Sequence, residues 1–209
     1  MTDELIFYTN PMSRGRIVRW MLEEIGRPYR TELLDYGTTM KAPDYLAINP
    51  MGKVPALRHG DAVVTETAAI CAYLADAFPD AGLAPPPGDR LRAPYYRWLF
   101  FAAGPLEAAA TNKALGFVTP KEREGNVGYG SFAAVMDVLD ATLSRADYVV
   151  GERFSAVDVY LGSHIGFGLR FDSIEKRPAF ERYWERIAAR PAAVRARELD
   201  EALIAEQGL

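Results

Sequence analysis

The sequence predicts an α/β unit followed by an all-helical unit. Short apolar runs with strand character lie in the first part of the chain, interleaved with helical patterns. A proline-rich stretch, residues 78–89, then excludes long regular elements, because proline fixes φ and removes a backbone donor. Beyond it apolar residues recur mainly at helical spacing. We therefore expect residues 1–79 to form a βαβ–ββα domain with a mixed four-stranded sheet, 80–89 a linker, and 90–209 an all-α domain.

The first half of the α/β unit has the pattern strand, helix, strand. Residues 5–8 form an apolar run that suits a buried strand. Residues 14–25 repeat apolar side chains every three to four positions, which predicts an amphipathic helix, and Gly26 ends it. Residues 29–34 can form a second strand. This order implies a parallel, right-handed crossover.

The second half has the pattern of a hairpin followed by a helix. The proline of the Val54-Pro55 pair cannot donate to a sheet ladder, so it belongs at a strand start or an edge. Residues 58–61 contain Gly-Asp between apolar runs and predict a tight turn. The return strand is 62–64, and Thr65 is the expected N-cap of a helix over 66–77.

The second unit is expected to consist of helices. One of them begins with a close relative of a capping box, in which Ser155 is the N-cap and Asp158 follows three positions later. This explains Asp158 structurally, without a catalytic role. The expected helices are 90–115, 123–144, 155–168, 178–190 and 191–205.

Composition excludes several classes of function. The net charge is −4, the pI is about 5.3, and no basic run is present, which argues against a nucleic acid or an anionic membrane as the main partner. No apolar segment approaches the roughly 18 residues of a membrane helix, so we expect a cytoplasmic protein. Cys71 is the single cysteine and the two histidines are isolated, so we expect no disulfide and no metal site.

The Val54-Pro55 strand and the helix start at Glu66 and Thr67 have the chemistry of a peptide-binding edge. A cis bond before Pro55 would hold the N–H and C=O of Val54 in one direction. Such a pair can bond an extended ligand as a strand would. The helix N-terminus beside it favours carboxylates.

Together these features resemble the cytosolic glutathione transferases over nearly the whole chain. The likeness is carried by residues 8–16, residues 52–57, the Glu66-Thr67 pair and the cap at 155–158. It implies a thioredoxin-like N-terminal domain that binds glutathione, a helical domain that shapes a pocket for an electrophile, and a homodimer. The co-substrate would be glutathione, with no metal.

The resemblance also implies which residues hold glutathione. The expected set is Lys41, Lys53, Val54, Pro55, Glu66 and Thr67. Val54 would offer its backbone to the cysteinyl unit, Glu66 and Thr67 would hold the γ-glutamyl end, and Lys53 would meet the glycyl carboxylate. Lys41, in the loop after the second strand, is a weaker candidate.

Ser13 is the expected donor to the glutathione sulfur. It follows the first strand at the start of the first helix, where ligands of open α/β folds bind. It also matches the serine of the family's serine-type members, three residues before Arg16. Tyr8 and Asn10 are the alternative donors. Ser13 could also act only as a helix cap.

The expected reaction is conjugation of the glutathione thiolate to small hydrophobic electrophiles. Two other functions stay open. One is a non-enzymatic module of the same fold that binds glutathione or another ligand, or serves in assembly. The other is a specialised glutathione-dependent dehalogenase, isomerase or lyase.

Overall fold

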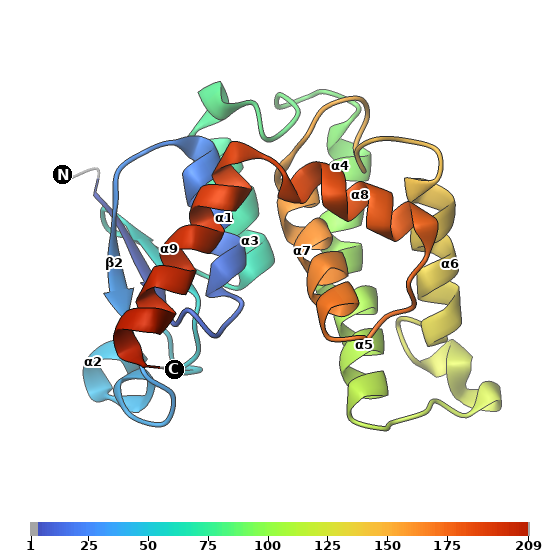
Figure 1. The fold of residues 1–209 in the computed structure, drawn as a ribbon, viewed down its shortest axis with the longest axis horizontal. Helices are drawn as coiled ribbons and strands as arrows, with labels where there is room; N and C mark the ends of the chain where they lie inside the picture. Colours follow the sequence, from blue (N-terminus) through green and yellow to red (C-terminus); the bar gives the residue numbers. More distant parts are fainter. Residues whose placement is uncertain (1–3, 209) are drawn as a thin grey trace. The chain divides into compact units, whose positions relative to one another are not determined.

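The computed structural model describes residues 4–208. Contacts between Cα atoms divide the chain into two compact units (Figure 1). The first extends to Gly82 and includes residues from Arg190 onward, whereas the second comprises Leu83–Ala189. The predicted boundaries placed the last of these segments, residues 190–209, in the helical domain. In the structure this segment packs within the first unit instead.

The first unit has the predicted βαβ–ββα order, with short helical turns inserted. Its elements are β1 (Leu5–Thr9), α1 (Gly15–Ile25), β2 (Tyr29–Leu33), η1 (Thr39–Lys41), α2 (Pro43–Leu46), β3 (Ala56–His59), β4 (Ala62–Thr65), α3 (Thr67–Ala77), η2 (Pro79–Ala81) and α9 (Pro191–Gln207). The turn between β3 and β4 contains Gly60 with a φ of 56°, the positive value that such a short connection requires.

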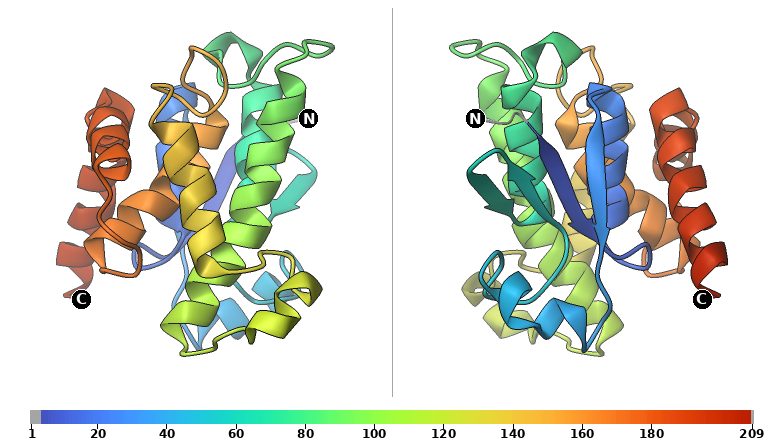
Figure 2. Two further views of the ribbon diagram at one scale, coloured as in Figure 1. Left: turned by 90° about the vertical axis from the view of Figure 1, so that its right-hand side faces the viewer. Right: turned by 90° about the vertical axis from the view of Figure 1, so that its left-hand side faces the viewer.

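The four strands form a mixed sheet in the order β2–β1–β3–β4 (Figure 2). β1 and β2 are parallel, and the pairs β1/β3 and β3/β4 are antiparallel. The parallel pair is joined through α1, which confirms the predicted parallel strand–helix–strand order. This is a thioredoxin-like domain.

The two faces of the sheet are covered by different segments. Phe7 faces α1, because the Arg19 guanidinium lies 5.2 Å from the centre of its ring. Its neighbour Tyr8 points to the opposite face, where it forms a core cluster with Met40 of η1 and Tyr45 of α2. This alternation is the two-residue period of a strand that is buried on both faces.

Helix α9 packs along α1 within the first unit (Figure 1). Arg19 of α1 and Asp200 of α9 form a buried ion pair with an Nε–Oδ1 distance of 2.7 Å. The Arg190 guanidinium donates to both carboxylate oxygens of Glu24 at 2.7 and 2.8 Å. These charges attach the end of the chain to the first helix.

The second unit is helical, as predicted. Its elements are α4 (Arg92–Phe101), a π-helical segment η3 (Ala102–Leu106), α5 (Glu107–Ala114), η4 (Lys121–Asn126), α6 (Phe132–Leu143), α7 (Ala156–Arg170) and α8 (Pro178–Ala188). The prediction of one helix over residues 123–144 was wrong at its start. Ser131 caps α6 by accepting a hydrogen bond from Ala134 N at 3.2 Å, so the helix begins at Phe132, nine residues later than expected.

Helix α7 begins with the predicted capping box of Ser155 and Asp158. The Asp158 carboxylate is fully buried and accepts hydrogen bonds from Ser155 N at 2.9 Å, Val149 N at 2.9 Å and the Tyr183 hydroxyl at 2.8 Å. Burial raises the pKa of Asp158, and these donors oppose that effect. Asp158 therefore joins a loop, the start of α7 and α8, as a structural carboxylate. Within residues 4–208, no helix is both long and apolar enough to cross a membrane.

Candidate active site

The sheet register brings three predicted site segments to one edge of the first unit. Tyr8, near the end of β1, is paired with Ala56 at the start of β3, and Ala56 is paired with Thr65 at the end of β4. The chain segments adjoining these three residues must therefore leave the sheet at the same edge. They are residues 9–13, 53–55 and 66–67.

Ser13 lies in the turn that precedes α1. Its side-chain hydroxyl donates to Asn10 O at 2.6 Å and accepts from Gly15 N at 2.9 Å. The residue as a whole is half-buried. A hydroxyl in this position caps the helix start, and it can donate to a sulfur atom only after releasing the Asn10 carbonyl.

Both alternative sulfur donors have structural partners. The Asn10 side chain is buried, donates to Leu34 O at 2.9 Å, and accepts from Met12 N at 2.9 Å. Tyr8 is 8% exposed, and its ring centre lies 5.7 Å from that of Tyr45 in the core. Asn10 thus shapes the loop after β1, and Tyr8 is part of the packing beneath it.

The Val54–Pro55 peptide bond is cis. Within residues 4–208, the N–H and C=O of Val54 make no hydrogen bond, so both remain available to a ligand. The carbonyl of the preceding Lys53 accepts from the Tyr45 hydroxyl at 2.6 Å and from Asn49 Nδ2 at 2.8 Å. Sequence analysis missed these two positioning residues, although the Asn-Pro pair at 49–50 is a signal for a turn.

Lys41 stabilises the loop that leads to this edge. Its ammonium group donates to Met51 O at 3.1 Å and to Gly52 O at 2.9 Å. A Cβ at Gly52 would lie 2.7 Å from Met40 O, and the φ of 56° is also one that favours glycine. Lys41 therefore has a loop-holding contact that its sequence position alone does not reveal.

Lys53 and Glu66 carry the free charges of the edge. Both side chains are exposed, and neither has an ion pair or hydrogen bond with any residue from 4 to 208. Glu66 has a φ of 66° and a ψ of 119°, a backbone conformation that is unusual for a residue with a side chain. Such outliers are concentrated at binding sites.

The start of α3 differs from the prediction by one residue. Thr65 was expected to be the N-cap, but it ends β4, and Glu66 occupies the N-cap position. The pairing of Thr65 with Ala56 extends the strand and overrides the capping preference of threonine. Thr67 is the first residue of the helix and is 8% exposed, and the N–H groups of this first turn have no acceptor within the helix.

Among residues 4–208, neither the single cysteine nor a metal-binding cluster adds a reactive group to this edge. Complete burial raises the pKa of the Cys71 thiol to about 12, which keeps it protonated at neutral pH. Within the described residues, no group of three or more His, Cys, Asp or Glu side chains is arranged to hold a metal ion.

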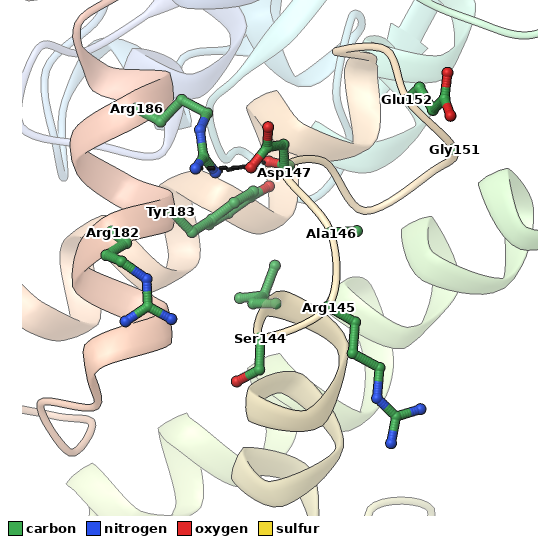
Figure 3. Close-up of a pocket in the computed structure, with 10 residues that line it drawn as sticks. Ser144, Arg145, Ala146, Asp147, Gly151, Glu152, Arg182, Tyr183 and Arg186 are labelled. Atoms are coloured by element: carbon green, nitrogen blue, oxygen red, sulfur yellow. Dashed lines mark hydrogen bonds and ion pairs between the residues drawn. The ribbon is translucent and has the colours of Figure 1, made fainter.

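A separate pocket of about 810 Å³ lies within the second unit, between α8 and the loop after α6 (Figure 3). Arg186 and Asp147 form an ion pair across it with an N–O distance of 2.8 Å. The buried ring of Tyr183 contributes an apolar wall, but its hydroxyl is occupied by Asp158. The lining contains none of the predicted glutathione contacts.

Family models match both halves of the chain. Residues 12–77 match the model described as glutathione S-transferase, N-terminal domain, and residues 110–191 match glutathione S-transferase, C-terminal domain. The sequence is 30% identical over 204 residues to glutathione S-transferase 3 of maize (Zea mays), covering 90% of each chain.

Solved structures give the same result. A glutathione transferase from Methylococcus capsulatus superposes with a TM-score of 0.78 at 30% identity, covering 95% of this chain and 99% of that one. A sphingomonad glutathione S-transferase complexed with glutathione has a TM-score of 0.77 at 28% identity, covering 94% and 98%.

Proposed function

Because the chain belongs to the glutathione S-transferase family, we propose that it joins the glutathione thiolate to small hydrophobic electrophiles at the edge formed by β1, β3 and β4. The observation that carries this proposal is that residues 9–13, 53–55 and 66–67, which contain the proposed ligand-binding groups, meet at that edge. An unbonded strand-like backbone, a free cation and a helix N-terminus are the groups that a peptide with two carboxylates requires.

Each group has a proposed role toward glutathione. The N–H and C=O of Val54, held before the cis bond to Pro55, pair with the cysteinyl unit. The Lys53 ammonium binds the glycyl carboxylate. Glu66 binds the amino group of the γ-glutamyl end, and Thr67 with the N-terminus of α3 binds its carboxylate. The absence of internal partners for Lys53 and Glu66 among residues 4–208 supports these roles.

Ser13 is the proposed donor to the sulfur. A free thiol has a pKa of about 8.5, so lowering it by about two units requires roughly 2.7 kcal/mol of preferential thiolate stabilisation. The thiol proton leaves to solvent, the Ser13 hydroxyl turns from the Asn10 carbonyl toward the thiolate, and the sulfur attacks an electrophilic carbon. A new carbon–sulfur bond forms as the leaving group departs with its electron pair or, in an addition, as the electrophile accepts the pair.

Lys41 acts through the loop in this proposal. Because its ammonium group holds the carbonyls of Met51 and Gly52, it fixes the position from which Lys53 reaches the ligand. A direct contact between Lys41 and glutathione is not needed.

The electrophile is expected to contact apolar side chains of the helical unit. Phe100 and Phe117 are 73% and 65% exposed and are available for such contacts, whereas Tyr95 is fully buried in the core. We also propose that the protein is cytoplasmic and forms a homodimer. Sedimentation at several concentrations tests the homodimer.

The test is glutathione binding by calorimetry, combined with conjugation to a panel of haloarenes, epoxides and enones. We expect the native protein to bind glutathione and turn over at least one electrophile class. Lys53→Ala should weaken binding about fivefold or more, as loss of a charge-assisted hydrogen bond implies. Lys121→Ala, which removes an exposed lysine of the helical unit, is the matched control and should bind normally.

The outcomes separate the candidate functions. Binding without turnover of any electrophile would favour the non-enzymatic module. Turnover restricted to one reaction type would favour a specialised dehalogenase, isomerase or lyase. Equal binding by Lys53→Ala and the native protein would contradict the assigned carboxylate contact.

A further inference from the structure

Two turns at the proposed glutathione site have the same sequence and the same geometry. Both read Asn-Pro-Met, at residues 10–12 and 49–51. In each, the asparagine Oδ1 accepts from the methionine N–H, at 2.9 Å for Met12 and 3.1 Å for Met51. In each, the asparagine Nδ2 also donates to a main-chain carbonyl, that of Leu34 at 2.9 Å for Asn10 and that of Lys53, later in the same loop, at 2.8 Å for Asn49. The methionine backbones are therefore fixed while their side chains extend outward.

The exposure of these two methionines separates them from the other methionines among residues 4–208. Met12 and Met51 are 62% and 63% exposed, whereas Met21, Met40 and Met136 are between 0% and 2% exposed. An oxidant in solution can reach the first two thioethers without unfolding the chain. Oxidation of the other three requires the core to open.

Both exposed methionines adjoin proposed glutathione contacts. Met12 directly precedes Ser13, and Met51 lies two residues before Lys53 in the loop held by Lys41. Each thioether is therefore close in the chain to a group that the ligand would meet, one at the sulfur and one at the glycyl carboxylate. A chemical change at either position acts on the site while the fold stays intact.

We propose that Met12 and Met51 are sites of reversible oxidation by peroxides, and that their sulfoxides weaken the glutathione site. The effect of the sulfoxides on glutathione binding rests on the proposed function, whereas the oxidation of the two methionines does not. The methionine sulfur attacks one peroxide oxygen, the O–O bond breaks, and an alcohol or water leaves. The sulfur is oxidised from thioether to sulfoxide, and the peroxide is reduced.

The two sulfoxides act on different steps. A sulfoxide oxygen is a hydrogen-bond acceptor with negative partial charge. At Met12 it opposes the thiolate beside Ser13 and therefore raises the pKa of bound glutathione. At Met51 it competes with the glycyl carboxylate for the Lys53 ammonium and therefore lowers affinity.

The experiment exposes the folded, full-length protein to hydrogen peroxide, removes the peroxide, and maps oxidation by peptide mass spectrometry. We expect one added oxygen at Met12 and at Met51, with Met21, Met40 and Met136 unchanged. The glutathione dissociation constant should rise about three- to tenfold, the change that corresponds to loss of one hydrogen bond. A methionine sulfoxide reductase should restore the original value.

Leucine variants show whether the two sites cause the effect. The double variant Met12→Leu with Met51→Leu keeps the apolar volume and should bind glutathione equally before and after peroxide. Met136→Leu, which changes a buried methionine of the other unit, should remain sensitive. Far-ultraviolet circular dichroism before and after treatment verifies that the fold is kept.

Three results would overturn the proposal. Oxidation of the buried methionines at the same rate as Met12 and Met51 would show that exposure does not select the site. Sulfoxides at both positions with unchanged affinity and thiol pKa would refute the coupling to glutathione. Failure of the untreated protein to bind glutathione would refute the proposed function and the coupling together, while the oxidation map would still test the chemistry by itself.

Discussion

Replacement of Ser13 by alanine tests the proposed chemistry most directly. A hydroxyl that donates to a thiolate contributes about 1.5–3 kcal/mol. Here it must first release the Asn10 carbonyl, which it contacts at 2.6 Å, and that bond contributes about 0.5–1.5 kcal/mol. The net gain of roughly 1–2 kcal/mol corresponds to about one unit of pKa. We therefore expect the bound glutathione thiol in Ser13→Ala to have a pKa about one unit higher than in the native protein.

Ultraviolet absorbance of the bound thiolate across pH measures this shift, and calorimetry reports binding separately. Ser13→Ala also removes the acceptor for Gly15 N, so we expect a stability loss of about 1 kcal/mol. Ser131→Ala is the matched control, because it removes a similar hydroxyl cap from α6 and leaves the thiol unaffected. A thiol pKa in Ser13→Ala equal to the native value would refute the assignment and direct attention to Tyr8 or Asn10.

Three further predictions concern buried groups. Asp158→Ala should lower the free energy of unfolding by about 3–5 kcal/mol in urea titrations, since it leaves several buried donors without an acceptor; a loss below about 1 kcal/mol would contradict this. Asp200→Ala should cost a similar amount by stranding the Arg19 charge, whereas the exposed Glu198→Ala on the same helix should be nearly neutral. The pKa of the Cys71 thiol is raised from 9.0 to about 12, so between these pH values the thiol ionises in the unfolded chain but not in the native one. Stability from this group is therefore complete below pH 9 and falls as pH rises toward 12, and iodoacetamide should modify Cys71 only as fast as the protein opens.

Much of the fold was predictable because it depends on local rules. The apolar spacing of residues 14–25, the glycine turn at residues 60–61 and the cap formed by Ser155 and Asp158 each act over a few neighbouring positions. The predicted order of strands and helices in the first unit follows from them. The proline of the Val54-Pro55 pair indicated a strand start for the same reason, whereas the cis form of the bond, considered only as a condition, is shown by the structure.

Where local rules competed with pairing, the sequence prediction was less accurate. Thr65 has good capping chemistry, yet its pairing with Ala56 keeps it in β4 and leaves Glu66 at the N-cap with a positive φ. Residues 123–144 have helical periodicity in part, but the cap at Ser131 delays α6. Sheet pairing and capping hydrogen bonds decide such boundaries. The spacing of apolar residues does not show which of these interactions is the stronger at a given position.

The sequence by itself determined the family, the domain types and the residue set proposed to meet glutathione, because a few motifs in fixed order encode them. Only the tertiary structure revealed the hydrogen-bond partners of Lys41 and the Ser13 hydroxyl, since the carbonyls that they contact are positioned by the folding of their loops. It also placed α9 against α1 through Arg19 and Asp200, which are 181 positions apart. Contacts across such separations depend on the packing of the whole unit, which no local pattern contains.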